Sequence, residues 1–303
     1  MMVLVGPTAS GKSALALALA ERWNAEILSA DSMQVYRGMD IGTAKPTLVE
    51  RGRIRHHLVD VVEPTESFTV ARFVELADAV IDDARARDVP LIVTGGSPLY
   101  FKALFEGLFS GPSADEALRD RLRALDNATL HARLALVDPV AAERIHVNDT
   151  KRLVRALEVF KLTGKPISLQ QAEWTDGARR FEACWYGLHW DRQLLNRRIN
   201  ARVKQMLADG WLEEVRGLLA RHGRLSATAA EATGYAELMA HLRGAMSLDD
   251  AVERIKIATR QLARRQMKWL RRWTQVRWLD GSLPIAELVR RVESEPTTTA
   301  ASP

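Results

Sequence analysis

Residues 6–13 follow the pattern G-x-x-x-x-G-K-S and read Gly6-Pro7-Thr8-Ala9-Ser10-Gly11-Lys12-Ser13. A short apolar run, residues 3–5, precedes them, and an Ala- and Leu-rich run, residues 14–20, follows. This is the strand–loop–helix context that a phosphate-binding loop requires. Glycines let the backbone wrap around phosphate oxygens, and N–H groups at the new helix N-terminus point at the anion. We expect Lys12 to add a positive charge and the Ser13 hydroxyl to hold Mg²⁺. The alternative is a glycine-rich turn that binds nothing.

Length and composition set limits on the class of protein. The chain has 303 residues, which is long for one domain, so we expect a core domain that carries an additional segment. Its hydrophobic content of 47% is enough for a packed core. No run approaches twenty apolar residues and no charged-then-apolar leader precedes the first strand, so we expect a soluble, cytoplasmic protein. The single cysteine, Cys184, excludes a disulfide framework and a cysteine-based zinc site. A net charge of +5 permits a nucleic-acid partner without requiring one.

Apolar runs and helical periodicities alternate along the first hundred residues. Residues 3–5, 25–30, 57–62 and 91–94 are expected to be strands. Residues 70–81 have the 3–4 spacing of a helix. Such alternation indicates a parallel α/β sheet with ligands at the carboxyl ends of its strands. The phosphate loop, Asp31 and Gly95-Gly96 all fall at predicted strand ends.

The pattern changes near residue 112. Residues 114–164 are helical and charged without strand signals, and residues 181–190 resemble a strand that returns to the sheet. We therefore expect a discontinuous core, residues 1–112 and 182–287, that carries a helical insertion at 113–181. The chain after Asp191 is expected to be helical, and residues 288–303 are expected to be a disordered tail.

Asp31 is the only acid at a predicted strand end in the region of the phosphate loop. The strand at 91–94, by contrast, ends in two glycines, without the second acid that phosphoryl-transfer enzymes use to hold Mg²⁺. A carboxylate across a cleft from Lys12 and Ser13 could accept a proton from an incoming nucleophile. The alternative interpretation of Asp31 is a helix cap or turn residue.

Basic residues gather on a long helix predicted at 248–273. Four of them repeat at i, i+4 spacing and form one face, namely Arg260, Arg264, Lys268 and Arg272. A row of cations with few acids suits a phosphate backbone, whereas the alternative is a solvated face with intrahelical ion pairs. A shorter basic patch lies at residues 151–155. Arg202 is a candidate for contact with a diphosphate, with a helix-surface cation as the alternative.

The sequence resembles the tRNA dimethylallyltransferases, also called tRNA isopentenyltransferases. The most specific matching block is Ser29–Pro46, which reads SADSMQVYRGMDIGTAKP. Further matches are residues 6–13, 56–58, 95–96, 99–104, 152–158, 198–203, 233–235 and 258–266. Together they reach from the phosphate loop to about residue 279. One departure is Ser97-Pro98, where relatives usually have threonine followed by glycine or methionine; Ser97 keeps the hydroxyl, and Pro98 removes a donor.

The resemblance implies a fold, a reaction and a set of residues. The fold is a P-loop-kinase-like parallel core with an inserted helical domain and a helical C-terminal part. The reaction moves a dimethylallyl group from dimethylallyl diphosphate to N6 of the adenosine on the 3′ side of the anticodon, and it needs Mg²⁺. Asp31 would be the general base, Lys12 and Ser97 would assist catalysis, and residues 6–13 with Arg202 would bind diphosphate. Contacts to the tRNA anticodon stem-loop are implied for Asp31, Ser32, Met33, Gln34, Ser97, Arg119, Lys151, Arg152, Leu153, Val154, Arg155, Arg260, Arg264 and Lys268.

Two other functions remain open from the residues alone. A small-molecule kinase could use ATP on the same loop, although the missing acid after residue 94 argues against it. A non-catalytic RNA-binding module with a relic loop is the third possibility. No heptad pattern indicates self-association, so we expect a monomer.

Overall fold

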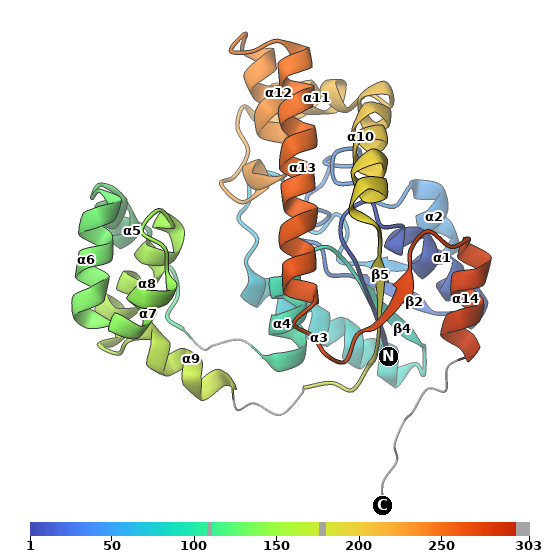
Figure 1. Cartoon of the computed structure of the whole chain (residues 1–303), viewed down its shortest axis with the longest axis horizontal. Helices are drawn as coiled ribbons and strands as arrows, with labels where there is room; N and C mark the ends of the chain where they lie inside the picture. The colour runs from blue at the N-terminus through green and yellow to red at the C-terminus, as the bar shows by residue number, and fades with distance from the viewer. Residues whose placement is uncertain (108–110, 176–179, 295–303) are drawn as a thin grey trace, which may run out of the picture. The chain divides into compact units, whose positions relative to one another are not determined.

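The computed structural model describes residues 1–107, 111–175 and 180–294 (Figure 1). Two compact units make up the chain: residues 1–103 with 182 onward form one, and residues 104–181 form the other. The first division falls within a helix, α4 (Pro98–Glu106), and so lies earlier than the expected boundary at 112. The second falls at 181/182, where the strand was expected to return.

A single parallel sheet of six strands forms the centre of the first unit. Its order is β3-β2-β4-β1-β5-β6. The strands are β1 (Met2–Val5), β2 (Glu26–Ser29), β3 (His56–His57), β4 (Leu91–Thr94), β5 (Cys184–His189) and β6 (Arg277–Asp280). Because β2, β4 and β1 are neighbours, the loops that follow them meet at one edge of the sheet. The predicted parallel α/β class is confirmed.

Two strand expectations need correction. Of the run at 57–62 only His57 belongs to a strand, the two-residue β3, because Leu58 and Asp60 adopt positive φ values of 59° and 57° that end the strand. Val62 then makes an isolated bridge to Tyr36. Strand β6 was not expected; its sequence, Arg-Trp-Leu-Asp, is short and mixed because it lies at the edge of the sheet.

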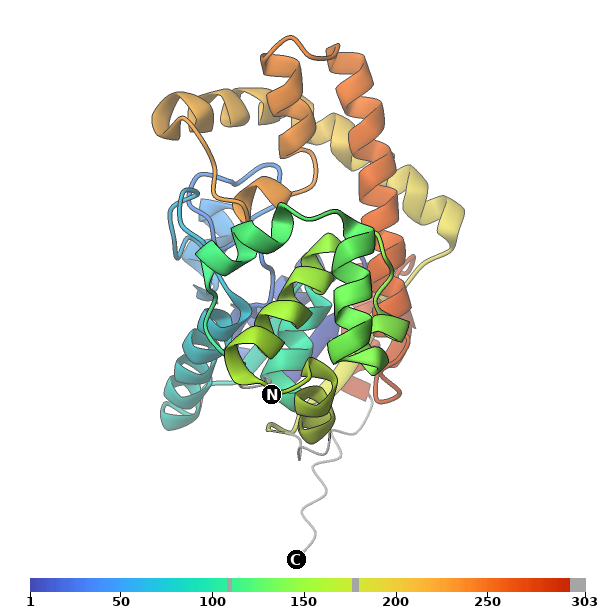
Figure 2. The same ribbon diagram turned by 90° about the vertical axis from the view of Figure 1, so that its left-hand side faces the viewer.

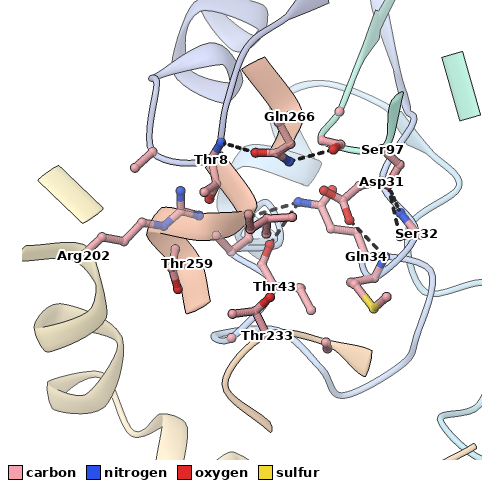
Figure 3. Close-up of a pocket in the computed structure, with 18 of the residues that line it drawn as sticks. Thr8, Asp31, Ser32, Gln34, Thr43, Ser97, Arg202, Thr233, Thr259 and Gln266 are labelled. Atoms are coloured by element: carbon pink, nitrogen blue, oxygen red, sulfur yellow. Dashed lines mark hydrogen bonds between the residues drawn. The ribbon is translucent and has the colours of Figure 1, made fainter. Parts of the chain in front are cut away.

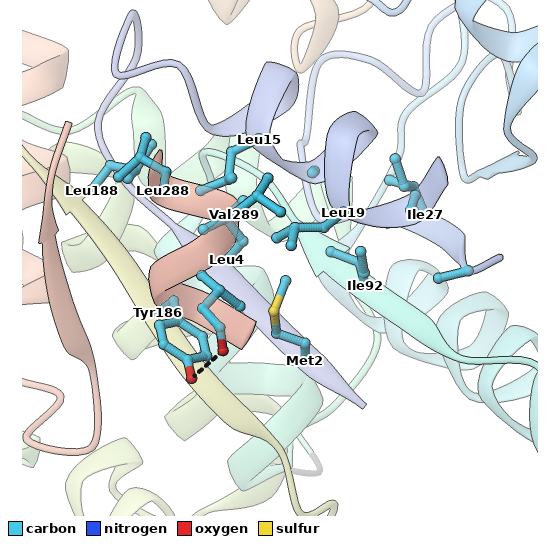
Figure 4. Packing of buried hydrophobic residues seen from close by; sticks show 14 of the residues in the cluster. Met2, Leu4, Leu15, Leu19, Ile27, Ile92, Tyr186, Leu188, Leu288 and Val289 are labelled. Atoms are coloured by element: carbon cyan, nitrogen blue, oxygen red, sulfur yellow. Dashed lines mark hydrogen bonds between the residues drawn. The ribbon is translucent and has the colours of Figure 1, made fainter. Parts of the chain in front are cut away.

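Helices of the first unit pack on the sheet and extend beyond it. They are α1 (Lys12–Trp23), α2 (Leu48–Arg53), α3 (Val70–Ala86), α10 (Arg192–Ala208), α11 (Trp211–His222), α12 (Tyr235–Leu242), α13 (Leu248–Leu270) and α14 (Ile285–Ser294), with a 3₁₀ turn at Ala229–Glu231. Figure 4 shows Leu15 and Leu19 of α1 and Leu288 and Val289 of α14 in one cluster with sheet residues. This burial removes apolar surface from water and fixes α1, and hence the loop before it, on the sheet.

Helix α14 overturns part of the expected tail. Residues 288–294 are helical, and Leu288, Val289 and Val292 are buried against α1 and the sheet. The helical spacing of these three apolar residues indicates an amphipathic helix, although the composition of the segment is polar. The rest of the expected tail, residues 295–303, lies outside the described residues.

The second unit is a small helical bundle (green to yellow-green in Figure 2). Its helices are α5 (Glu116–Arg123), α6 (Asn127–Val137), α7 (Pro139–Arg144), α8 (Thr150–Thr163) and α9 (Ile167–Thr175). An aspartate side chain caps each of the first four helices, namely Asp115, Asp126, Asp138 and Asp149. Such caps satisfy backbone N–H groups that have no helical partner. Leu130, Leu134 and Leu153 are fully buried in the core of this unit.

Candidate functional site

The loop after β1 has the geometry of an anion cradle. Gly11 precedes α1 with φ 94°, a conformation that favours glycine, and α1 begins at Lys12. The first N–H groups of a helix have no partner within it, so they are free to meet an anion. Two carbonyls of the loop are held by side chains from outside it: Arg198 Nε donates to Ala9 O at 3.0 Å and Trp190 Nε1 donates to Ser10 O at 2.9 Å.

One cavity of about 210 Å³ joins this loop to the other strand ends (Figure 3). Lys12 and Ser13 come from the phosphate loop, and Asp31 comes from the loop after β2. Residues 95–97 follow β4 and line the same cavity. Side chains of α10 and α13 complete it, including Arg202 and Gln266. The structure thus brings together the predicted acid and the predicted cations.

Two cations border the cavity. Burial lowers the pKa of Lys12 to about 8, the Asp31 carboxylate opposes this fall, and Arg202 adds to it. The Lys12 Nζ donates to Pro7 O at 3.4 Å, a long contact that leaves its other protons available. Burial also lowers the pKa of Arg202, again opposed by Asp31. Arg202 lines two further cavities, of about 550 and 450 Å³, that also border the phosphate loop and residues 40–48 respectively.

Asp31 makes a turn and also lines the cavity. Its Oδ1 accepts the Met33 N–H at 2.9 Å, so Asp31 does stabilise a turn, as its alternative interpretation proposed. The second oxygen, Oδ2, lies beside Gly96: a Cβ on that glycine would be 3.2 Å from it. Gly95 passes so close to Ala30 that a Cβ there would be 2.1 Å from its carbonyl oxygen. The two glycines therefore let the loop after β4 approach the acid.

Ser97 holds the segment that follows Asp31. Its Oγ accepts the Ser32 N–H at 3.0 Å and donates to Ser32 Oγ at 3.0 Å. Pro98 is the first residue of α4, where the absence of an N–H removes no helical hydrogen bond. The departure at Ser97-Pro98 is thus compatible with the local structure.

Gln34 anchors the next loop of the cavity wall. Its Oε1 accepts from Ser29 Oγ at 2.9 Å, and its Nε2 donates to Thr43 O and Ala44 O at 3.4 and 3.2 Å. The buried Lys45 ammonium holds the same loop by donating to Tyr36 O at 2.7 Å and to Asp60 Oδ1 at 2.6 Å. The amide of Gln34 is therefore occupied by its own chain. Met33 also lines the cavity.

Sequence reasoning missed several cavity residues. Thr43, Thr233, Thr259 and Gln266 line the cavity, yet none was singled out as a catalytic or diphosphate-binding residue. The signal for Gln266 was its place on the face of α13 that carries Ala263 and Leu270, because a polar residue on a buried face must find partners there.

The predicted contacts in the second unit divide into three groups. Lys151 and Arg152 are exposed. Leu153 and Val154 are buried in the core, so the tRNA contact predicted at these two positions would have to use the backbone. The side chain of Arg155 is half-buried and donates to Glu158 Oε2 at 2.6 Å and to Pro112 O at 3.1 Å.

Arg119 is likewise held by Glu158. Its Nε donates to Glu158 Oε1 at 2.9 Å and its Nη2 to Oε2 at 3.1 Å. The Glu158 side chain is fully buried; burial raises the pKa of Glu158, but the bonds from Arg119 and Arg155 outweigh it and keep that pKa below its usual value. The tRNA contact that the resemblance implies for Arg119 stays a prediction, and the structure adds that its guanidinium is already paired with Glu158.

The basic face of α13 differs along its length. Arg260 Nη1 donates to Asn200 Oδ1 at 2.7 Å. Arg264 and Lys268 are exposed and, among the described residues, make no ion pair. The guanidinium of Arg272 lies 5.5 Å from the ring centre of Trp269. The predicted stripe of cations is therefore accessible at Arg264 and Lys268.

No metal cluster pre-exists in the described part of the chain, where no three His, Cys, Asp or Glu side chains are grouped as ligands. The exposed Ser13 hydroxyl lines the cavity next to the loop amides. Within the same described ranges, no helix is both long and apolar enough to span a bilayer.

The chain is similar to known proteins over most of its length. The family model described as IPP transferase matches residues 34–273. The tRNA dimethylallyltransferase of Geobacter metallireducens is 48% identical over 284 residues, which cover 92% of each chain. The tRNA dimethylallyltransferase of Anaeromyxobacter dehalogenans is 48% identical over 297 residues, which cover 96% of each chain.

Solved structures are similar over the whole chain. A tRNA isopentenylpyrophosphate transferase from Bacillus halodurans superposes with a TM-score of 0.72 at 37% identity, covering 96% of this chain and 93% of that one. A eukaryotic dimethylallyltransferase acting on tRNA gives a TM-score of 0.81 at 28% identity, covering 100% of this chain and 82% of that one.

Proposed function

Because the chain belongs to the IPP transferase family, we propose that it transfers a dimethylallyl group from dimethylallyl diphosphate to a tRNA. The acceptor is N6 of the adenosine on the 3′ side of the anticodon. The observation that carries this proposal is the shared cavity in which Lys12, Ser13 and Arg202 lie with Asp31. A phosphoryl-transfer enzyme would need a second acid after β4, and Gly95-Gly96 stand there.

The reaction is an alkyl substitution at the first carbon of the donor. The N6 nitrogen forms a bond to that carbon, the carbon–oxygen bond breaks, and diphosphate leaves with the electron pair. Lys12, Arg202 and the free N–H groups at the start of α1 stabilise the negative charge that develops on the leaving group. Asp31 accepts the proton that the amine loses, since its carboxylate borders the same space.

Mg²⁺ fits this site only together with the substrate. Ser13 supplies one hydroxyl, and the remaining ligands would come from diphosphate oxygens and water, because no cluster of acids is grouped in the described residues. When bound, the ion neutralises charge on the diphosphate.

The exposed cations are the basis for RNA contact in this proposal. Arg264 and Lys268 on α13 and Lys151 and Arg152 on α8 suit phosphates of the anticodon stem-loop. The adenine would leave the loop stack to reach the cavity, which is easier for a loop nucleotide than for a paired one. Asp31, Ser32, Met33, Gln34 and Ser97 would border the base. We also propose that the protein acts as a monomer inside the cell.

Transfer is tested with unmodified tRNA and each of two donors. With dimethylallyl diphosphate we expect N6-dimethylallyl adenosine, detected by mass spectrometry of nucleosides, and one diphosphate released per modification. With ATP we expect no transfer of phosphate to RNA or to small molecules. Phosphate transfer from ATP without prenylation would support the kinase alternative, and RNA binding without either product would support the non-catalytic one.

A further inference from the structure

A buried amide joins two walls of the cavity. Gln266 lies on α13 and is 5% exposed. Its Oε1 accepts the Thr8 N–H at 2.8 Å, and its Nε2 donates to Gly96 O at 2.6 Å (Figure 3). One side chain therefore connects the phosphate loop to the loop after β4, and it lines the cavity between them.

The two partners stand on opposite sides of the proposed chemistry. Thr8 belongs to the loop that would hold the diphosphate. Gly96 borders the acid: a Cβ on it would lie 2.8 Å from Gln266 Nε2 and 3.2 Å from Asp31 Oδ2. Ser97, the next residue, holds Ser32 beside Asp31. The path from leaving-group cradle to acid is thus Thr8, Gln266, Gly96, Asp31.

We propose that Gln266 is a positioning residue that sets the separation between the phosphate loop and Asp31. This inference rests on the proposed transfer reaction. Thr8 offers a donor and Gly96 an acceptor, so the connection needs one group that both accepts and donates. An amide does so, a carboxylate cannot donate, and a hydrocarbon satisfies neither partner. Misplacing reacting groups by about 1 Å can lower a rate about 100-fold, so this separation matters for the reaction.

Gln266→Glu provides a nearly isosteric test. Its carboxylate would face the Gly96 carbonyl and the nearby Asp31 oxygen, both of which repel it. At pH 8 we expect kcat to fall about 100-fold, while KM for tRNA and pyrophosphate affinity change less than about threefold. Protonation of the introduced carboxylate restores a group that can donate to Gly96 O and accept from the Thr8 N–H. The ratio of variant to wild-type kcat should therefore rise as pH falls from 8 to 5.5.

Two further variants separate positioning from folding. Gln261→Glu places the same charge at an exposed position of α13, and its kcat ratio should stay near one at every pH. Gln266→Met keeps the length of the side chain without either bond, and its kcat should be low with a ratio that does not vary with pH. It also replaces Gln266→Glu as the test if the latter does not fold.

The outcomes distinguish this inference from the proposed function. Absence of prenylation by the wild-type protein would overturn the function. Normal prenylation by wild type together with near-normal kcat in Gln266→Glu or in Gln266→Met would overturn the positioning role alone. The positioning role would also be overturned if the kcat of Gln266→Glu were reduced equally at all pH values, or if only its KM changed.

Discussion

Lys12 and Asp31 line one cavity, and the carboxylate of Asp31 opposes the burial that lowers the pKa of the Lys12 ammonium to about 8. Their residues follow two different strands, β1 and β2, with β4 between them in the sheet. The pairing of an anion-binding cation with a nearby acid is what a substitution with a diphosphate leaving group requires.

The first prediction concerns proton uptake at Lys12. A bound anion favours the charged ammonium, so it raises the pKa of Lys12 from about 8, and binding at pH 8.5 takes up a proton. Pyrophosphate affinity should therefore weaken as pH rises through 8. Calorimetry at pH 8.5 in two buffers of different ionisation enthalpy measures the uptake. Lys12→Arg stays charged throughout, so it should show less uptake than wild type with the same ligand. Equal uptake in the two proteins would refute the role of Lys12.

The second prediction concerns the acid. Asp31→Asn keeps an oxygen for the Met33 N–H but removes the base, so single-turnover prenyl transfer should slow about 100-fold or more. Binding of tRNA, measured by filter retention, should change less than about threefold. Transfer at the wild-type rate would show that another group takes the proton.

The third prediction concerns the basic face of α13. Arg264→Gln and Lys268→Gln should each weaken tRNA binding and reduce the slope of log K against log salt by about one. Arg290→Gln on α14, where Arg290 pairs with Glu287, is the control and should leave the slope unchanged. If the α13 variants keep the wild-type slope, these cations do not meet phosphates.

The fourth prediction concerns the close approach of Gly95 to Ala30. Gly95→Ala puts a Cβ 2.1 Å from a backbone oxygen, and the loop beside Asp31 must move. We expect a loss of about 1–3 kcal/mol in the free energy of unfolding, measured in urea, together with lower activity. Gly217→Ala is the matched control: Gly217 lies within α11 with open space at its Cβ, so stability should rise by about 0.5–1 kcal/mol. A neutral Gly95→Ala would contradict the close approach.

The phosphate loop, Asp31 and the parallel sheet could be predicted because their signals are local. A loop conformation depends on neighbouring residues, and the strand ends in a parallel sheet meet at one edge whatever the strand order. The role of Arg119 was harder to predict, since an arginine looks the same in sequence whether it faces solvent or a buried glutamate. Glu158, its partner, is 39 residues away.

Residues 6–13 were enough to predict an anion site, and the motifs along the chain were enough to predict the family. Which side chains close the cavity depended on the folded chain. Gln266 bonds to Thr8 across 258 residues and to Gly96 across 170, and no local pattern encodes such a pairing. The physical reason is that a hydrogen bond needs donor and acceptor within about 3 Å, and only packing of α13 against the sheet loops brings these atoms together.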